Sequence, residues 1–140
     1  MKSLIPLIVI LFFLLPGCGK KGPPVYPQKT PVPAVSDLTY RIDGNIMTLT
    51  WTIPEAKGKE AFDGFIVYRY QRPDSDSPCK NCPKLFQQVA NIEIDTSDYE
   101  NRNMDYREEI IKGFVYTYKV VLFTKDGASG TDSNHVDFNY

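Results

Sequence analysis

The stretch IMTLTWTI, residues 46–53, indicates most directly how this chain folds. Apolar residues occupy its odd positions from Met47 to Ile53, and threonines occupy positions 48, 50 and 52. This period-two alternation is typical of a β-strand with one buried face. Turn residues precede it at Asp43-Gly44-Asn45, and Pro54 ends the pattern. The sequence therefore predicts a strand over 46–53 that follows a tight turn.

Similar short runs occupy the rest of the body. Strands are predicted at 37–42, 62–70, 85–94 (as one or two short strands), 105–111, 115–124 and 135–140. No segment shows a sustained helical period, and nine tyrosines with eight phenylalanines favour strands. About seven short strands in about 100 residues is the size of an immunoglobulin-like β-sandwich. We therefore expect an all-β fold over 36–140.

Particular residues carry a family resemblance over 36–140. Leu38, LTW at 49–51 with Pro54, and GFIVYR at 64–69 resemble the first three strands of a fibronectin type III domain. GFVYTYKV at 113–120 resembles a later strand, strand F, of that family. The resemblance implies a fibronectin type III β-sandwich in which Trp51 is a buried core residue. It also implies that Tyr116 forms a tyrosine corner, with its hydroxyl bonded to nearby backbone.

The first seventeen residues have the character of a secretory signal. Lys2 precedes twelve largely apolar residues, 4–15, which are too few to span ~30 Å of hydrocarbon as a helix. LPGC at 15–18 resembles the lipobox of bacterial lipoproteins, which implies cleavage before Cys18 and lipidation of its thiol. Gly19, in place of Asp, implies the outer membrane, in its periplasmic leaflet. An ordinary secreted protein or an uncleaved anchor are the alternatives.

Residues 18–35 are predicted to form a lipidated tether. Five prolines lie between Gly19 and Val35 and favour an extended, semi-stiff spacer. The run CGKKGPPVYP, 18–27, resembles the start of small lipoproteins that assist maturation of the lipopolysaccharide translocon. Alternatively, the run has no specific meaning, because any lipoprotein tether is rich in Lys, Gly and Pro.

Cys79 and Cys82 form a C-x-x-C motif between two prolines. A zinc site needs about four ligands, and a thioredoxin-like centre needs a helix N-terminus, so neither is expected here. A structural disulfide in an oxidising compartment is the favoured interpretation. No cofactor or metal is predicted.

Composition and motifs argue against catalysis and nucleic-acid binding. The net charge is −1, which offers no electrostatic attraction for nucleic acid. The single histidine, His135, has no visible nucleophile partner, and an exposed edge-strand position is expected for it. No phosphate loop or paired-carboxylate motif occurs. We therefore expect a non-enzyme.

One predicted surface is apolar. If Phe65 and Val67 face the core, the alternating residues point to solvent together with neighbours from the strand over 115–124. The resulting candidate partner-binding set is Ile66, Tyr68, Tyr70, Val121 and Phe123. Alternatively, the insertion that carries Cys79 and Cys82, or the tether, folds over this set.

These features predict a lipid-anchored, periplasm-facing protein-interaction or scaffolding module of the outer membrane. Acylated Cys18 would contact membrane lipid, and a protein partner would bind the body. The alternative, from the tether resemblance, is an assembly factor for the lipopolysaccharide translocon or another outer-membrane machine.

Overall fold

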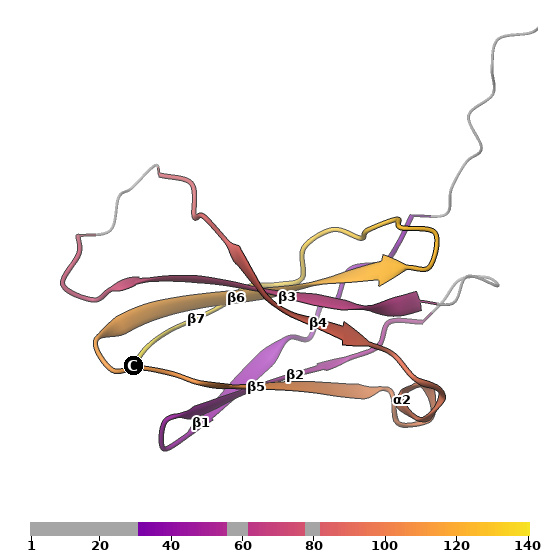
Figure 1. Ribbon diagram of the computed structural model, residues 1–140, viewed down its shortest axis with the longest axis horizontal. Coiled ribbons are helices and arrows are strands. Elements are labelled where there is room, and N and C mark those ends of the chain that lie inside the picture. Colours follow the sequence, from indigo (N-terminus) through magenta and orange to yellow (C-terminus); the bar gives the residue numbers. More distant parts are fainter. Residues whose placement is uncertain (1–30, 56–61, 78–81) are drawn as a thin grey trace, which may run out of the picture.

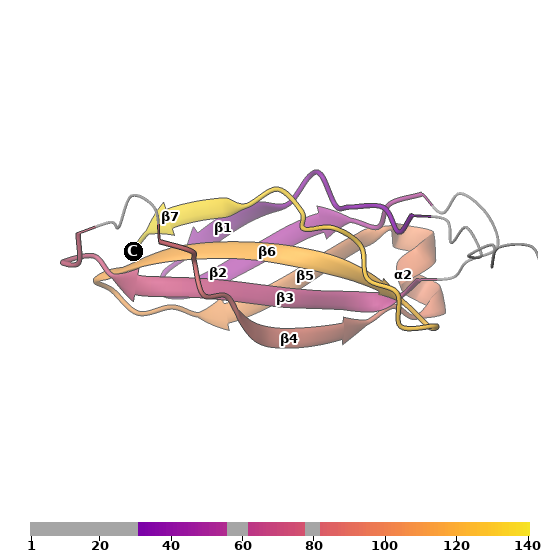
Figure 2. The same ribbon diagram turned by 90° about the horizontal axis from the view of Figure 1, so that it is seen from above.

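Two antiparallel sheets face each other in the computed structural model, which describes residues 31–55, 62–77 and 82–140 (Figures 1 and 2). One sheet has the order β1-β2-β5 and contains β1 (Thr39–Asp43), β2 (Ile46–Thr52) and β5 (Asn103–Glu109). The other has the order β4-β3-β6-β7 and contains β3 (Phe62–Pro73), β4 (Gln87–Glu93), β6 (Phe114–Thr124) and β7 (Val136–Asn139). The all-β sandwich expected from the sequence is confirmed.

The strand predicted over residues 46–53 is present as β2. Met47, Leu49 and Trp51 in β2 are buried, while the threonines between them are exposed or half-buried. β1 and β2 form a hairpin in which Asp43 pairs with Ile46. Gly44 lies between them with a φ of +59°, which glycine adopts without the steric cost that a Cβ brings.

Several large aromatic side chains pack with aliphatic residues in the core between the sheets. Trp51 of β2 meets Phe65 of β3 edge-on, with ring centroids 5.4 Å apart. Phe138 of β7 stacks on Tyr116 at 5.4 Å and on Tyr118 at 6.0 Å. Burying one large apolar side chain contributes about 1.5–3 kcal/mol, so the burial of these rings contributes substantially to folding.

Tyr116 also makes the hydrogen bonds of a tyrosine corner. Its hydroxyl accepts from the backbone N–H of Ile111 at 2.9 Å and donates to the carbonyl of the same residue at 3.1 Å. Tyr116 itself is 2% exposed. The side chain therefore ties the β5–β6 turn to the core of the sandwich.

A short helix, α2 (Thr96–Asn101), lies between β4 and β5 and was not predicted. Asp95 caps it by accepting hydrogen bonds from the N–H groups of Ser97 and Asp98, and Arg102 ends it in the left-handed conformation. Six residues are too few to display a helical period, so only the capping residues signal the helix.

The packed body begins earlier than the sequence suggested. Val35 is 2% exposed and belongs to the core, and Val32 packs against it. A Cβ at Gly130 would lie 2.9 Å from the carbonyl oxygen of Pro33, so the β6–β7 loop closely contacts this entering segment. Residues 32–35, which the sequence places in the tether, are thus part of the folded body.

The chain enters the body at one end and finishes at the other (Figure 1). α2 and the β6–β7 loop lie at the entry end, whereas the β1–β2 turn lies with the C-terminus. Along the β1–β7 side, the Asn134 side-chain amide accepts from Leu38 N–H at 3.0 Å and donates to its carbonyl at 2.8 Å. At the far end, the Tyr140 hydroxyl donates to the Gly44 carbonyl at 2.7 Å.

Candidate functional site

The outer face of the β1-β2-β5 sheet is polar. The strand alternation that buries Leu49 and Trp51 turns the intervening threonines outward, and the Thr39 and Thr50 hydroxyls share a hydrogen bond of 2.9 Å there. Ile46, which is 39% exposed, is an apolar exception. The other outward residues of this face include Thr48, Thr52, Asp105, Arg107 and Glu109.

The outer face of the β4-β3-β6-β7 sheet has the opposite character. Phe65 and Val67 are fully buried in the core, so the side chains between them face outward. The register pairs Ile66 with Val121 and Gly64 with Phe123, which brings the predicted set together. We call it the apolar outer face: Ile66, Tyr68, Tyr70, Val121 and Phe123. Val121 is 8% exposed, and the other four are half-buried.

Gly64 makes room for one member of this face. A Cβ built on Gly64 would lie 2.8 Å from Cζ of Phe123 and 2.3 Å from the carbonyl oxygen of Ile92. Both distances are shorter than real Cβ contacts, so glycine at this position permits the Phe123 ring to lie against β3.

A covering segment, residues 83–86, lies over one end of the apolar outer face. Lys84 Nζ donates to Thr117 Oγ1 and to Asp137 Oδ1, both at 2.8 Å, and lies 5.8 Å from the Tyr70 ring centroid. Phe86 approaches the same ring at 6.2 Å. Thr117 is fully buried although it points outward from β6. At this end the insertion does fold over the sheet, as one of the two sequence alternatives had it.

Lys119 carries positive charge into the middle of this face. Its Nζ lies 4.5 Å from the Phe86 ring centroid and 5.3 Å from that of Tyr68, and it pairs with Asp132 at 2.8 Å. A cation held between aromatic rings is stabilised by the ring quadrupoles. Strand alternation could have placed Lys119 here, but no sequence pattern indicates that residues 83–86 return to the sheet.

An ionic cluster joins the two sheets inside the sandwich. Arg69 of β3 pairs with Glu108 of β5, and the Tyr118 hydroxyl donates to the second Glu108 oxygen at 2.8 Å. Burial and the charge of Glu108 raise the pKa of Tyr118 well above its usual range and that of Tyr106 to about 12. Because both carboxylate oxygens are engaged, the cluster serves as a crosslink between sheets.

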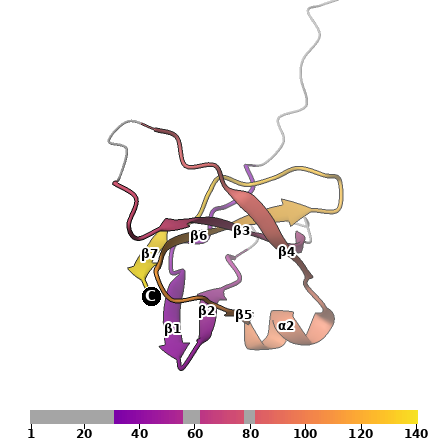
Figure 3. The same cartoon turned by 60° about the vertical axis from the view of Figure 1, so that its left-hand side comes forward.

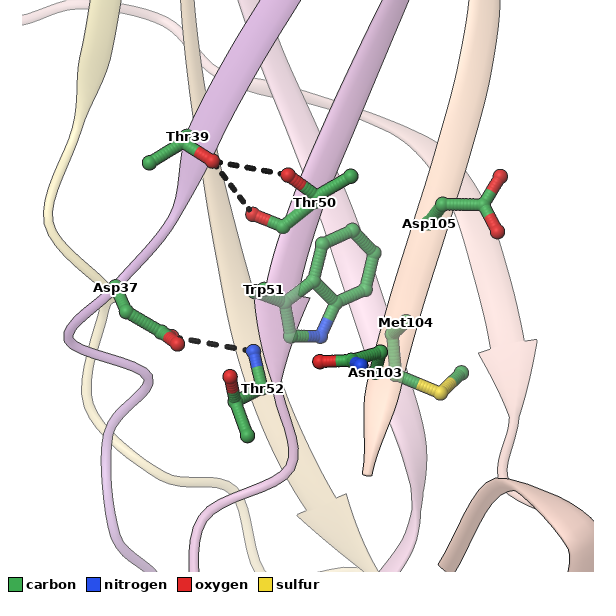
Figure 4. Close-up of a pocket in the computed structure, with 8 residues that line it drawn as sticks. All are labelled: Asp37, Thr39, Thr50, Trp51, Thr52, Asn103, Met104 and Asp105. Carbon is green, nitrogen blue, oxygen red and sulfur yellow. Dashed lines mark hydrogen bonds between the residues drawn. The ribbon is translucent and has the colours of Figure 1, made fainter. Parts of the chain in front are cut away.

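A shallow pocket of about 400 Å³ opens at the β1-β2-β5 sheet (Figure 4). Asp37 accepts a hydrogen bond there from the Thr52 N–H at 3.2 Å. The buried indole N–H of Trp51 has no hydrogen-bond partner among the described residues. The lining residues offer hydroxyls, an amide and carboxylates, a set suited to hydrogen bonding: Asp37, Thr39, Thr50, Trp51, Thr52, Asn103, Met104 and Asp105.

The remaining sequence candidates fall in different places. Cys82 is exposed and helps line a cavity of about 270 Å³ with Tyr70 and Lys84, whereas Cys79 and Cys18 lie outside the described residues. His135 precedes β7, with Nε2 3.9 Å from Asp132. No cluster of three or more metal-ligating side chains occurs within 31–55, 62–77 and 82–140. In these same segments, no helix has the length and apolar character that crossing a bilayer requires.

Comparison with known proteins identifies a fold. No protein-family model matches the sequence, and no curated protein matches it at a significant level. The solution structure of the third fibronectin III domain of human KIAA0343 protein superimposes with a TM-score of 0.56 at 14% identity, covering 86% of this chain and 92% of that one. The twitchin kinase region from C. elegans superimposes with a TM-score of 0.50 at 11% identity, covering 76% of this chain and 17% of that one.

Identities this low establish architecture alone. The strand orders β1-β2-β5 and β4-β3-β6-β7 agree with that architecture. The chain therefore has a fibronectin type III-like fold of the immunoglobulin-like β-sandwich class.

Proposed function

We propose that this chain is a lipid-anchored protein-interaction or scaffolding module that faces the periplasm at the outer membrane. The lipobox-like LPGC at 15–18 supports the anchor, because acyl chains on Cys18 would hold the protein on a bilayer without a spanning helix. If the proline-rich segment between Cys18 and Val32 is extended as the sequence predicts, at ~3.1 Å per residue, it would reach roughly 40 Å. The body would then work close to the membrane surface.

The contrast between the two outer faces carries this proposal. One sheet turns threonines and charged residues to solvent, and the other turns Ile66, Tyr68 and Phe123 outward. Aromatic and aliphatic side chains grouped on one face are typical of protein-interaction surfaces. Lys119, with Asp132 beside it, adds the polar component that such surfaces use for orientation.

A matched pair of substitutions tests the role of the apolar outer face. Ile66→Ser and Ile46→Ser make the same chemical change on opposite faces of the sandwich. We expect Ile66→Ser to reduce recovery of the partner after crosslinking in native membranes, and Ile46→Ser to leave recovery at the wild-type level. Thermal melting of both variants checks that the body still folds.

The outcome that contradicts the proposal is equally definite. If Ile66→Ser folds and recovers the same crosslinked proteins as the wild type, the apolar outer face is not the interaction surface. Equal loss in both variants would also contradict it, because the effect would then not depend on the face.

A second candidate function is assembly of the lipopolysaccharide translocon or another outer-membrane machine. The run CGKKGPPVYP at 18–27, with its likeness to maturation lipoproteins, is the observation that favours it. A chain in which residues 32–140 are replaced by an unrelated folded domain separates the two functions. Activity retained by that chimaera would assign the function to the tether, and activity lost would assign it to the sandwich.

We also propose that Cys79 and Cys82 form a disulfide in the periplasm. Closing so short a loop contributes at most about 2 kcal/mol, so the bond would order the β3–β4 insertion rather than the core. Protein purified from its native membrane is unfolded and alkylated with and without reductant, and its mass is measured. We expect two additional alkylated thiols only after reduction. Two reactive thiols without reductant would contradict the proposal.

A further inference from the structure

β4 is an edge strand that lacks basic residues and prolines. It ends its sheet in the order β4-β3-β6-β7, and Figure 3 shows it on the opposite side from β7. Its sequence, QQVANIE, contains no Lys, Arg or Pro, and its single charged residue is Glu93. The edge strands β1 and β5 carry charges of both signs, and β7 has only four residues. Charges, prolines, short length and β-bulges are devices that block edges, and of these β4 has its one acidic residue and the irregularity in its ladder to β3.

The outer edge of β4 keeps hydrogen-bonding capacity. Its ladder to β3 runs from Gly64–Glu93 to Arg69–Gln87, with one irregularity between Val67 and Tyr68. Among the described residues, the only backbone hydrogen bonds of Gln87–Glu93 are those to β3. In an edge strand, the N–H and C=O groups that point away from the ladder are available to another extended chain.

Side chains beside this edge are incompletely enclosed. Ala90 and Ile92 pair with Val67 and Phe65, so they face the interior, yet both are only half-buried. Tyr106, on the edge strand of the opposite sheet, is likewise half-buried against the core. An added strand with apolar residues at alternate positions would cover these side chains and extend the core.

Acidic groups gather at one end of the edge. Glu93 ends β4, Asp63 accepts a backbone hydrogen bond from Ile94 through its carbonyl, and Asp95 and Asp98 cap α2. Arg102, the nearby cation, pairs with Glu55. A basic residue on the incoming strand would therefore be attracted to the Glu93 end.

We propose that the β4 edge accepts an extended strand from a partner protein, with apolar residues at alternate positions and a basic residue beside Glu93. Main-chain hydrogen bonds provide the affinity, and the half-buried Ala90, Ile92 and Tyr106 select the side chains. This edge is distinct from the apolar outer face, so it stands or falls independently of the proposed function.

A synthetic peptide of alternating Val and Thr with two lysines at one end serves as the probe. It is titrated into the full-length chain in bilayer discs, and amide hydrogen exchange is followed along the body. We expect exchange in residues 87–93 to slow about tenfold or more at saturation. The same peptide N-methylated on four consecutive amides, which removes donors from both of its edges, should give no protection.

Two variants localise the effect. Asn91→Lys places a charge at an exposed position of β4, where it repels the lysines of the peptide, and should weaken binding of the peptide about tenfold or more. Thr39→Lys makes a comparable change on β1 and should leave binding unchanged. Equal protection by the methylated peptide, or protection confined to β1 or β5, would overturn the proposal. So would protection of 87–93 that rises with protein concentration without peptide, since that would identify a second copy as the occupant.

Discussion

At the scale of single residues, Tyr116 gives the most direct test of the sandwich. Tyr116→Phe keeps the buried ring but removes both hydrogen bonds to Ile111. We expect it to lower the free energy of unfolding by about 1–2 kcal/mol in urea denaturation. Tyr40→Phe, at a side chain that is 42% exposed, should change it by less than about 0.5 kcal/mol. Equal values for the two variants would exclude a tyrosine corner.

The Arg69–Glu108 pair makes a second residue-scale prediction. The two side chains are 22% and 16% exposed, so removing one partner leaves a largely desolvated charge. We expect Glu108→Leu to cost about 2 kcal/mol or more, and the double variant Arg69→Met with Glu108→Leu to cost less than Glu108→Leu alone. The measurement is a double-mutant cycle by urea denaturation. Additive costs would show that the two charges are energetically independent.

At the scale of elements, the covering segment 83–86 lies against the Tyr70 end of the apolar outer face. Lys84 attaches it through an ion pair whose side chains are 42% and 55% exposed, so the attachment contributes little, about 0–1 kcal/mol. We expect Lys84→Ala to accelerate amide hydrogen exchange around Thr117 while changing the melting temperature by only a few degrees. Leu85→Ala, at a side chain that is 78% exposed, is the matched control and should change neither. Unaltered exchange in Lys84→Ala would show that the segment is held by other contacts.

The elements also show which features the sequence could predict. β2 is recognisable because alternate burial leaves a period-two pattern from Met47 to Trp51. β6 is recognisable from the apolar residues at its even positions from Tyr116 to Leu122, although Thr117 and Val121 between them are buried as well. α2 is not recognisable, because one turn and a half of helix is defined by its caps rather than by a repeating pattern. Residues 32–35 belong to the folded body because of long-range contacts such as those with Gly130. Long-range contacts of this kind leave no pattern in the local sequence.

At the scale of the whole molecule, alternation predicted which residues share the apolar outer face but not what covers it. Ile66, Tyr68 and Phe123 follow from strand parity alone. The return of Lys84 and Phe86 onto Tyr70 is a long-range contact of an irregular segment, and such contacts leave no periodicity in the sequence.

The anchor determines where the whole molecule acts. We expect the intact mass of protein purified from native membranes to correspond to a chain that begins at Cys18 and carries two or three acyl chains. Cys18→Ser should release the body from the membrane fraction, because each buried methylene contributes roughly 0.8 kcal/mol to anchoring. A free thiol at Cys18, or a retained residue 1–17 segment, would contradict the proposed attachment.

Site-specific photo-crosslinking in intact cells tests most directly whether a partner protein binds through the apolar outer face. A photoreactive side chain at Tyr68, on the apolar outer face, is compared with one at Thr50, on the polar face of the opposite sheet. An interaction module that binds through the apolar outer face predicts a discrete adduct with one protein from position 68 and none from position 50. The same adduct from both positions, or none from position 68, would contradict it.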